Sequence, residues 1–153
     1  MNQDAYNLAL RRLSAREYSA HELAAYLERK EISREDAAEV VAKLVADRLL
    51  DDDRYARMMV RYQAGRGKGA GYIRMKLKAK GVELSTVQTR ALLGQVADKS
   101  ELTTARELIE RKYPDASKDR AAAAKAIQAL MRRGFSYDIA RKALSGAAPD
   151  EDY

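Results

Sequence analysis

Residues that could catalyse a reaction or hold a metal ion are scarce in this chain of 153 residues. It contains no cysteine and one histidine, His21, so neither a thiolate nor an imidazole pair is available to bind a metal ion. A Ser-His-Asp triad would depend on His21 alone, and its place beside Glu22 in a capping sequence indicates a surface residue. No pair of carboxylates in an apolar context suggests acid–base catalysis. We therefore expect no catalytic residue, no metal site, no cofactor and no enzymatic activity.

A glycine-rich stretch at residues 65–71, Gly-Arg-Gly-Lys-Gly-Ala-Gly, is the strongest candidate for a nucleotide site. A Walker A loop needs Ser or Thr after Gly-Lys, whereas Gly69 follows Lys68. No Gly-x-Gly-x-x-Gly register is complete, and the stretch follows an expected helix instead of a strand. Two interpretations stay open. Its backbone N–H groups, flanked by Arg66 and Lys68, contact phosphates or carboxylates, or the stretch is a flexible hinge.

Positive charge gathers in the middle third of the chain. Residues 1–50 carry 8 basic and 9 acidic side chains, residues 51–98 carry 10 and 5, and residues 99–153 carry 11 and 9. The net charges are −1, +5 and +2, within a formal total of +6. Between Arg54 and Val82 there are nine basic residues and no acidic one. Such a field attracts a polyanion or a protein that carries one.

One short stretch within this region concentrates the like charges. Arg74 with Lys78, and Lys76 with Lys80, stand four residues apart, on both sides of an apolar stripe of an expected helix over residues 72–80. Each such pair costs an isolated helix about 0.2–0.5 kcal/mol. We expect an anionic or acid-rich partner to offset this cost. A solvated charged face is the alternative.

Apolar residues recur with the period of an α-helix along almost the whole chain. Nine helices are expected: over residues 4–14, from Ser19, over 34–48, from the run Asp51–Asp53, over 72–80, from Ser85, from Ser100 to Pro114, from Ser117 to Gly134, and from Ser136 to Gly146. Serine caps mark most of the starts, and Glu22 and Gln88 complete two capping boxes. Because Gly and Pro are few, the composition favours an all-α chain.

The expected helices form three groups of three. The second helix of each group ends with a similar run, from Leu27 to Ile32, from Leu77 to Val82 and from Leu130 to Phe135. An apolar anchor, a turn and a second apolar residue are what a small three-helix unit needs to close its core. We expect modules at residues 1–50, 51–98 and 99–146, with bending between them, and a disordered acidic tail at 147–153.

The apolar stripes also include tyrosines. Tyr6, Tyr26, Tyr55 and Tyr62 lie on these stripes, so packing in the core is expected, with base stacking as the alternative. Val87 is expected to face inward on the sixth helix.

No apolar run approaches 18 residues and no leader peptide stands out, so we expect a cytoplasmic protein with no membrane contact.

Several of these segments together are similar to one family. They are Arg16-Glu-Tyr-Ser-Ala-His-Glu-Leu23, Leu50-Asp-Asp with Tyr55-Ala56, Gly67-Lys-Gly69 leading to Ile73, Leu77 and Lys80-Gly-Val82, and Arg132-Arg-Gly-Phe-Ser-Tyr137 with Ile139. In this order, over roughly residues 5–145, the set resembles the RecX regulatory family. One departure is Ala70, where that family usually has proline, so the entry to the helix is less rigid here.

The resemblance implies three tandem three-helix repeats, each similar to a helix-turn-helix, in an elongated, curved array. It also implies a monomer that binds the groove of the RecA–DNA filament and restrains ATP hydrolysis, strand exchange and co-protease activity, in recombination, DNA repair and the SOS response. The expected contact residues are basic: Arg66, Lys68, Arg74, Lys76, Lys78 and Lys80 first, and Arg132 and Arg133 second. Contact with single- or double-stranded DNA is left open. The alternative function is a helix-turn-helix protein that binds DNA directly, without RecA.

Overall fold

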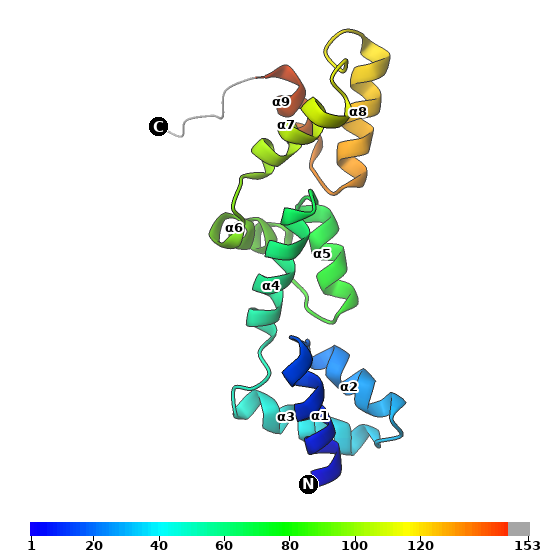
Figure 1. Cartoon of the computed structure of the whole chain (residues 1–153), viewed down its shortest axis with the longest axis vertical. Coiled ribbons are helices and arrows are strands. Elements are labelled where there is room, and N and C mark those ends of the chain that lie inside the picture. The colour runs from blue at the N-terminus through cyan, green and yellow to red at the C-terminus, as the bar shows by residue number, and fades with distance from the viewer. Residues whose placement is uncertain (147–153) are drawn as a thin grey trace. The chain divides into compact units, whose positions relative to one another are not determined.

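The computed structural model describes residues 1–146, and the expected acidic tail at 147–153 lies outside the described residues. Within the described part every regular element is a helix, which confirms the all-α class (Figure 1). The helices are α1 (Gln3–Ala15), α2 (Ala20–Arg29), α3 (Arg34–Ala46), α4 (Asp52–Gly65), α5 (Ala70–Ala79), α6 (Thr86–Val96), α7 (Glu101–Lys112), α8 (Arg120–Arg132) and α9 (Tyr137–Ser145). None of these helices is long and apolar enough to cross a membrane.

Side chains just before the helices satisfy the first backbone N–H groups, as the sequence predicted. Ser19 and Ser85 each accept from the third helical residue, and Glu22 and Gln88 complete the two capping boxes. The hydroxyl of Ser136 accepts from the N–H of Ile139 at the start of α9. The predicted starts at Ser33 and Ser100 are also confirmed. These contacts are local in sequence, which is why the pattern of residues reveals them.

The start of α8 differs from the prediction. Ser117 does not cap this helix, because it lies in a turn held by hydrogen bonds from Ala116 N to Tyr113 O and from Lys118 N to Asp115 O, both 3.0 Å. Asp119 is the cap instead, and its Oδ1 accepts from Ala122 N at 2.7 Å. A carboxylate satisfies the N–H groups and also complements the positive end of the helix dipole.

The glycine-rich stretch is shorter as a loop than the sequence suggested. Helix α4 continues through Gly65, and α5 begins at Ala70, two residues before the expected start. The early start follows from the carbonyl of Gly69, which accepts the first helical hydrogen bond from Ile73 N at 3.1 Å. The connection therefore comprises residues 66–69 only.

The chain divides into two compact units. The first comprises residues 1–58 and 77–83. Its core gathers Leu23 and Leu27 of α2, Val40 and Leu44 of α3, and Leu50. Helices α1, α2 and α3 pack against one another around these side chains (Figure 1). Tyr26 and Tyr55 are buried, as expected, and Tyr6 packs against this core.

The second unit comprises residues 59–76 together with the described residues from 84 onward. One core cluster of this unit gathers Leu108 and Ile109 of α7, Leu130 of α8, and Phe135. Helix α9 packs against both α7 and α8. The connection 66–69 and the turn between α8 and α9 both belong to this unit.

Two inward expectations are wrong. Tyr62 is 57% exposed, because the buried face of α4 runs through Val60 and Gln63. Val87 is 77% exposed, because α6 buries Thr89, Leu93 and the positions near them, which puts Val87 on the opposite side of the helix. The apolar stripe of a short helix is wide enough to include residues at its edge, and only the packing partner decides which edge is covered.

Candidate basic interface

The glycine-rich connection is held against the turn between α8 and α9 by backbone hydrogen bonds within the second unit. Gly69 N donates to Arg133 O at 2.8 Å, and Gly71 N donates to Gly134 O at 3.0 Å. Between them, Ala70 N donates to the Glu101 carboxylate at 3.1 Å. The carboxylate interpretation of the loop is thus realised within the chain itself. These N–H groups are engaged, so they do not form a phosphate cradle.

Glycine is required on both sides of this contact. A Cβ added to Gly69 would lie 2.6 Å from Gly134 C, and one added to Gly134 would lie 2.3 Å from Tyr72 N. Gly134 also has a φ of +99°, which other residues rarely adopt. The turn therefore approaches the start of α5 more closely than any side chain permits.

This approach brings basic residues from two distant parts of the sequence together. Lys68 Nζ lies 4.5 Å, and Lys76 Nζ 5.4 Å, from the centre of the Tyr72 ring. Nη1 of Arg133 lies 3.5 Å from the place that a Cβ on Gly67 would take. We call Lys68, Tyr72, Lys76 and Arg133 the loop cluster. Its two lysines lie beside the Tyr72 ring, and a cation is attracted to the face of such a ring.

Other predicted site residues stand around the loop cluster without entering it. The guanidinium of Arg66 lies 5.6 Å from the centre of the exposed Tyr62 ring. Arg74 Nε donates to Leu84 O at 3.0 Å, which fixes the side chain along α5. Arg132 is exposed at the last position of α8, beside Arg133. All of these residues belong to the second unit.

The last two predicted residues belong to the first unit and differ from each other. Lys78 is exposed on α5. Lys80 lies 3.3 Å from the Glu22 carboxylate, and its carbonyl accepts from the hydroxyl of Ser19 at 2.7 Å. Sequence reasoning identified Glu22 as part of a capping box, but nothing in the sequence pointed to its pairing with Lys80.

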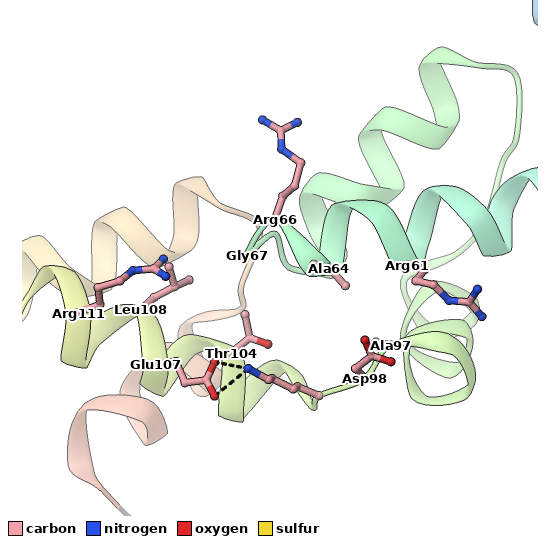
Figure 2. Close-up of a pocket in the computed structure, with 12 residues that line it drawn as sticks. Arg61, Ala64, Arg66, Gly67, Ala97, Asp98, Thr104, Glu107, Leu108 and Arg111 are labelled. Carbon is pink, nitrogen blue, oxygen red and sulfur yellow. Dashed lines mark hydrogen bonds and ion pairs between the residues drawn. The ribbon is translucent and has the colours of Figure 1, made fainter. Parts of the chain in front are cut away.

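A pocket of about 390 Å³ adjoins the connection within the second unit. Arg61 of α4 and Arg111 of α7 stand on opposite sides of it, and Arg66 is at its rim (Figure 2). Lys99 Nζ reaches Glu107 at 2.8 Å, the contact drawn as dashed lines in Figure 2. The pocket therefore extends the positive surface from the connection toward α7. Among the described residues there is no cluster of side chains suited to a metal ion.

Sequence comparison places all three helical groups in one family. Models of the first, second and third three-helix domains of RecX match residues 5–44, 51–89 and 99–144. The chain belongs to the RecX family. The family match confirms three three-helix domains in tandem, and RecX proteins are named as regulatory proteins.

Individual RecX proteins support the same assignment. The regulatory protein RecX of Trichlorobacter lovleyi is 33% identical over 144 residues, which cover 91% of this chain and 92% of that protein. The RecX of Streptococcus pyogenes serotype M1 is 31% identical over 150 residues, and the match covers 95% of this chain but 56% of that longer protein. The crystal structure of RecX from Lactobacillus salivarius has a TM-score of 0.80 at 27% identity, over 94% of both chains.

Proposed function

We propose that this RecX-family chain binds the RecA–DNA filament along its groove and inhibits RecA ATP hydrolysis, strand exchange and co-protease activity. The observation that carries the proposal is the basic surface of α5 and the connection before it. From Arg54 to Val82 no acidic residue interrupts nine basic ones, and Arg74, Lys76 and Lys78 are exposed. A nucleoprotein filament supplies the anionic surface that such a chain attracts.

The contact set is the one expected from the sequence. Its members are Arg66, Lys68, Arg74, Lys76, Lys78, Arg132 and Arg133, with Lys80 in the same predicted set although its ammonium group already pairs with Glu22. These cations bind the filament and take part in no chemical step. Occupation of the groove by a monomer in the cytoplasm would block growth of the filament or its closure on DNA.

The proposal is tested by measuring DNA-activated ATP hydrolysis by the cognate RecA while the chain is added in amounts well below those of RecA. Inhibition at such ratios is expected, because a block on filament growth acts on many protomers at once. No change up to equimolar amounts would contradict the proposal.

A charge-reversed variant identifies the surface responsible. Arg74→Glu combined with Lys78→Glu is expected to abolish inhibition, because it reverses two exposed charges without touching the core. Circular dichroism should show unchanged helicity. The matched control is Arg29→Glu with Arg34→Glu on the first domain, which carries no basic excess. If the Arg74 and Lys78 variant inhibits like the wild type, this surface does not bind the filament.

Direct DNA binding is the second candidate, because two exposed cations, Arg66 and Lys76, lie beside the rings of Tyr62 and Tyr72. Proteins that bind single-stranded nucleic acid combine cations, which contact the phosphates, with aromatic rings, on which the bases stack. Fluorescence anisotropy with labelled DNA and no RecA tests this function. Tight binding that weakens steeply with salt would favour it over the filament proposal.

A further inference from the structure

The carboxylate of Glu22 lies at the centre of a polar network in the first unit. Its side chain is 10% exposed. It accepts hydrogen bonds from Arg16 Nη2 at 3.1 Å and from Ser19 N at 3.3 Å, and it pairs with Lys80 Nζ at 3.3 Å. The buried Tyr55 lies close enough to this carboxylate for the charge of Glu22 to raise the pKa of its phenol. One carboxylate thus joins the start of α2 to α4 and to the end of α5.

The network keeps Glu22 ionised although little of its side chain is exposed. Burial opposes the charged form, but the hydrogen bonds from Arg16 and Ser19 and the charge of Arg16 outweigh this effect, so the pKa of Glu22 is lowered. Removal of one partner would leave this largely enclosed charge with fewer hydrogen bonds, which is costly. The carboxylate is therefore fully paired only while the end of α5 stays against the start of α2.

Backbone contacts at the same place align the two elements. The hydroxyl of Ser19 caps α2 by accepting from Glu22 N at 3.1 Å and donates to Lys80 O at 2.7 Å. Gly81, with a φ of +76°, lies so close to His21 that an added Cβ would stand 2.4 Å from the His21 Cβ. The start of α2 and the end of α5 are thus fitted to each other by main chain and side chain.

We infer that Glu22 and Lys80 are positioning residues that fix the first three-helix domain onto the end of α5. Lys80 then serves an internal contact, whereas Lys78, two residues before it and exposed, remains available to a partner. For inhibition of RecA, the inference rests on the proposed function. For the contact itself it does not.

The contact is tested by measuring a distance within the first unit. Because the chain has no cysteine, Arg29→Cys and Ala79→Cys, both at exposed positions, accept spin labels on α2 and α5. Pulsed electron paramagnetic resonance should give a narrow distance distribution in the wild-type background. Lys80→Met and Glu22→Gln should each broaden it. Lys80→Arg should keep the distance distribution narrow, since arginine also donates hydrogen bonds to a carboxylate.

Two lysine variants serve as comparisons. Lys78→Met should leave the distance distribution narrow, because its side chain is exposed. Lys43→Met breaks only the exposed ion pair with Asp47 and should also leave it narrow. Circular dichroism of every variant separates a broken contact from an unfolded chain. A narrow distribution in both Lys80→Met and Glu22→Gln would overturn the inference.

The ATPase assay then separates positioning from contact. Lys80→Met and Glu22→Gln should both raise the concentration needed for half-inhibition, by about threefold or more, as coupling changes of this kind do. Lys43→Met should have no effect. If Lys80→Met weakens inhibition but Glu22→Gln does not, Lys80 contacts the filament directly and the inference is wrong. If the wild type does not inhibit RecA, the proposed function is wrong. The spin-label distances then still test the contact between Glu22 and Lys80.

Discussion

A largely enclosed carboxylate, that of Glu22, and a buried phenol, that of Tyr55, lie near each other at the start of α2. Tyr55 is 1% exposed and lies near Glu22, which Arg16 and Lys80 hold ionised. Ionisation of Tyr55 would place a second negative charge in the same enclosed site. Burial first, and then the charge of Glu22 and the hydrogen bond to it, raise the pKa of Tyr55 to about 12.

We expect Tyr55 to ionise near pH 12 in the folded protein. Near-ultraviolet absorbance of tyrosinate measures this, and Tyr55→Phe should remove the step near pH 12. Because the folded pKa lies above the unfolded value of about 10, the folded state retains the proton longer. The contribution of Tyr55 to stability is therefore complete below pH 10 and is lost as the pH rises through about 12.

Glu22→Gln provides the control for this prediction. It removes the negative charge but leaves Tyr55 buried, so the step that Tyr55 contributes should move from about pH 12 toward lower pH without reaching the value of an exposed tyrosine. If Tyr55→Phe leaves the absorbance near pH 12 unchanged, Tyr55 is not enclosed with a carboxylate.

At the scale of elements, local features were readable from the sequence and distant ones were not. The caps of α2, α6 and α9 could be predicted because Ser19, Ser85 and Ser136 bond to N–H groups three residues away. The end of α7 was marked by Pro114. The prediction that Ser117 caps α8 was wrong because serine also occurs in turns, and the local sequence does not distinguish a turn from a helix cap.

The contacts that build the candidate site join residues far apart in the sequence. Gly69 meets Arg133, and Glu22 meets Lys80, through the packing of separate helices. The sequence indicated that Lys68, Lys80 and Arg133 are basic and lie near turns. It did not indicate that Tyr72 holds two lysines, or that Lys80 is paired, because neither follows from spacing along one helix.

The close approach of Gly134, in the turn after α8, to the start of α5 leads to a prediction about stability. Gly134→Ala should lower the free energy of unfolding by about 1–3 kcal/mol, because alanine must adopt a left-handed backbone. Its Cβ would also overlap Tyr72 N, which lies 2.3 Å from that position. Urea unfolding at neutral pH measures the change.

Gly94→Ala is the matched control. Gly94 lies inside α6, where nothing stands within 4 Å of an added Cβ. Alanine there should raise the free energy of unfolding by about 0.5–1 kcal/mol, the ordinary helical preference of alanine over glycine. Equal decreases in both variants would mean that the close approach at Gly134 has no special role.

At the scale of the whole molecule, the sequence revealed the family, the helical class and the distribution of charge. The +5 of residues 51–98 contrasts with the −1 of residues 1–50. Charges attract a partner over about one Debye length, roughly 8 Å at physiological salt, so their local density matters more than their sum. The sequence could not tell which cations are already engaged within the chain, and the structure identifies Lys80 as one of them.

The distribution of charge leads to a prediction that net charge alone does not make. Arg74→Gln with Lys78→Gln, and Arg29→Gln with Arg34→Gln, each remove two positive charges from the formal total of +6. All four side chains are exposed. Binding to a labelled RecA–DNA filament should weaken strongly only for the first pair. Its dependence on salt should also become shallower, by about one unit in the logarithmic slope for each phosphate that the variant no longer neutralises.

Titration of the filament at several salt concentrations, with each pair of substitutions and with the wild type, measures both effects. The second pair should keep the wild-type slope, because the domain that carries it has no basic excess. Equal weakening by the two pairs would mean that the chain is attracted by its net charge, and that α5 has no particular place in the interface. Weakening confined to the Arg74 and Lys78 pair would place the anionic partner against α5, where it would offset the repulsion between like charges four residues apart.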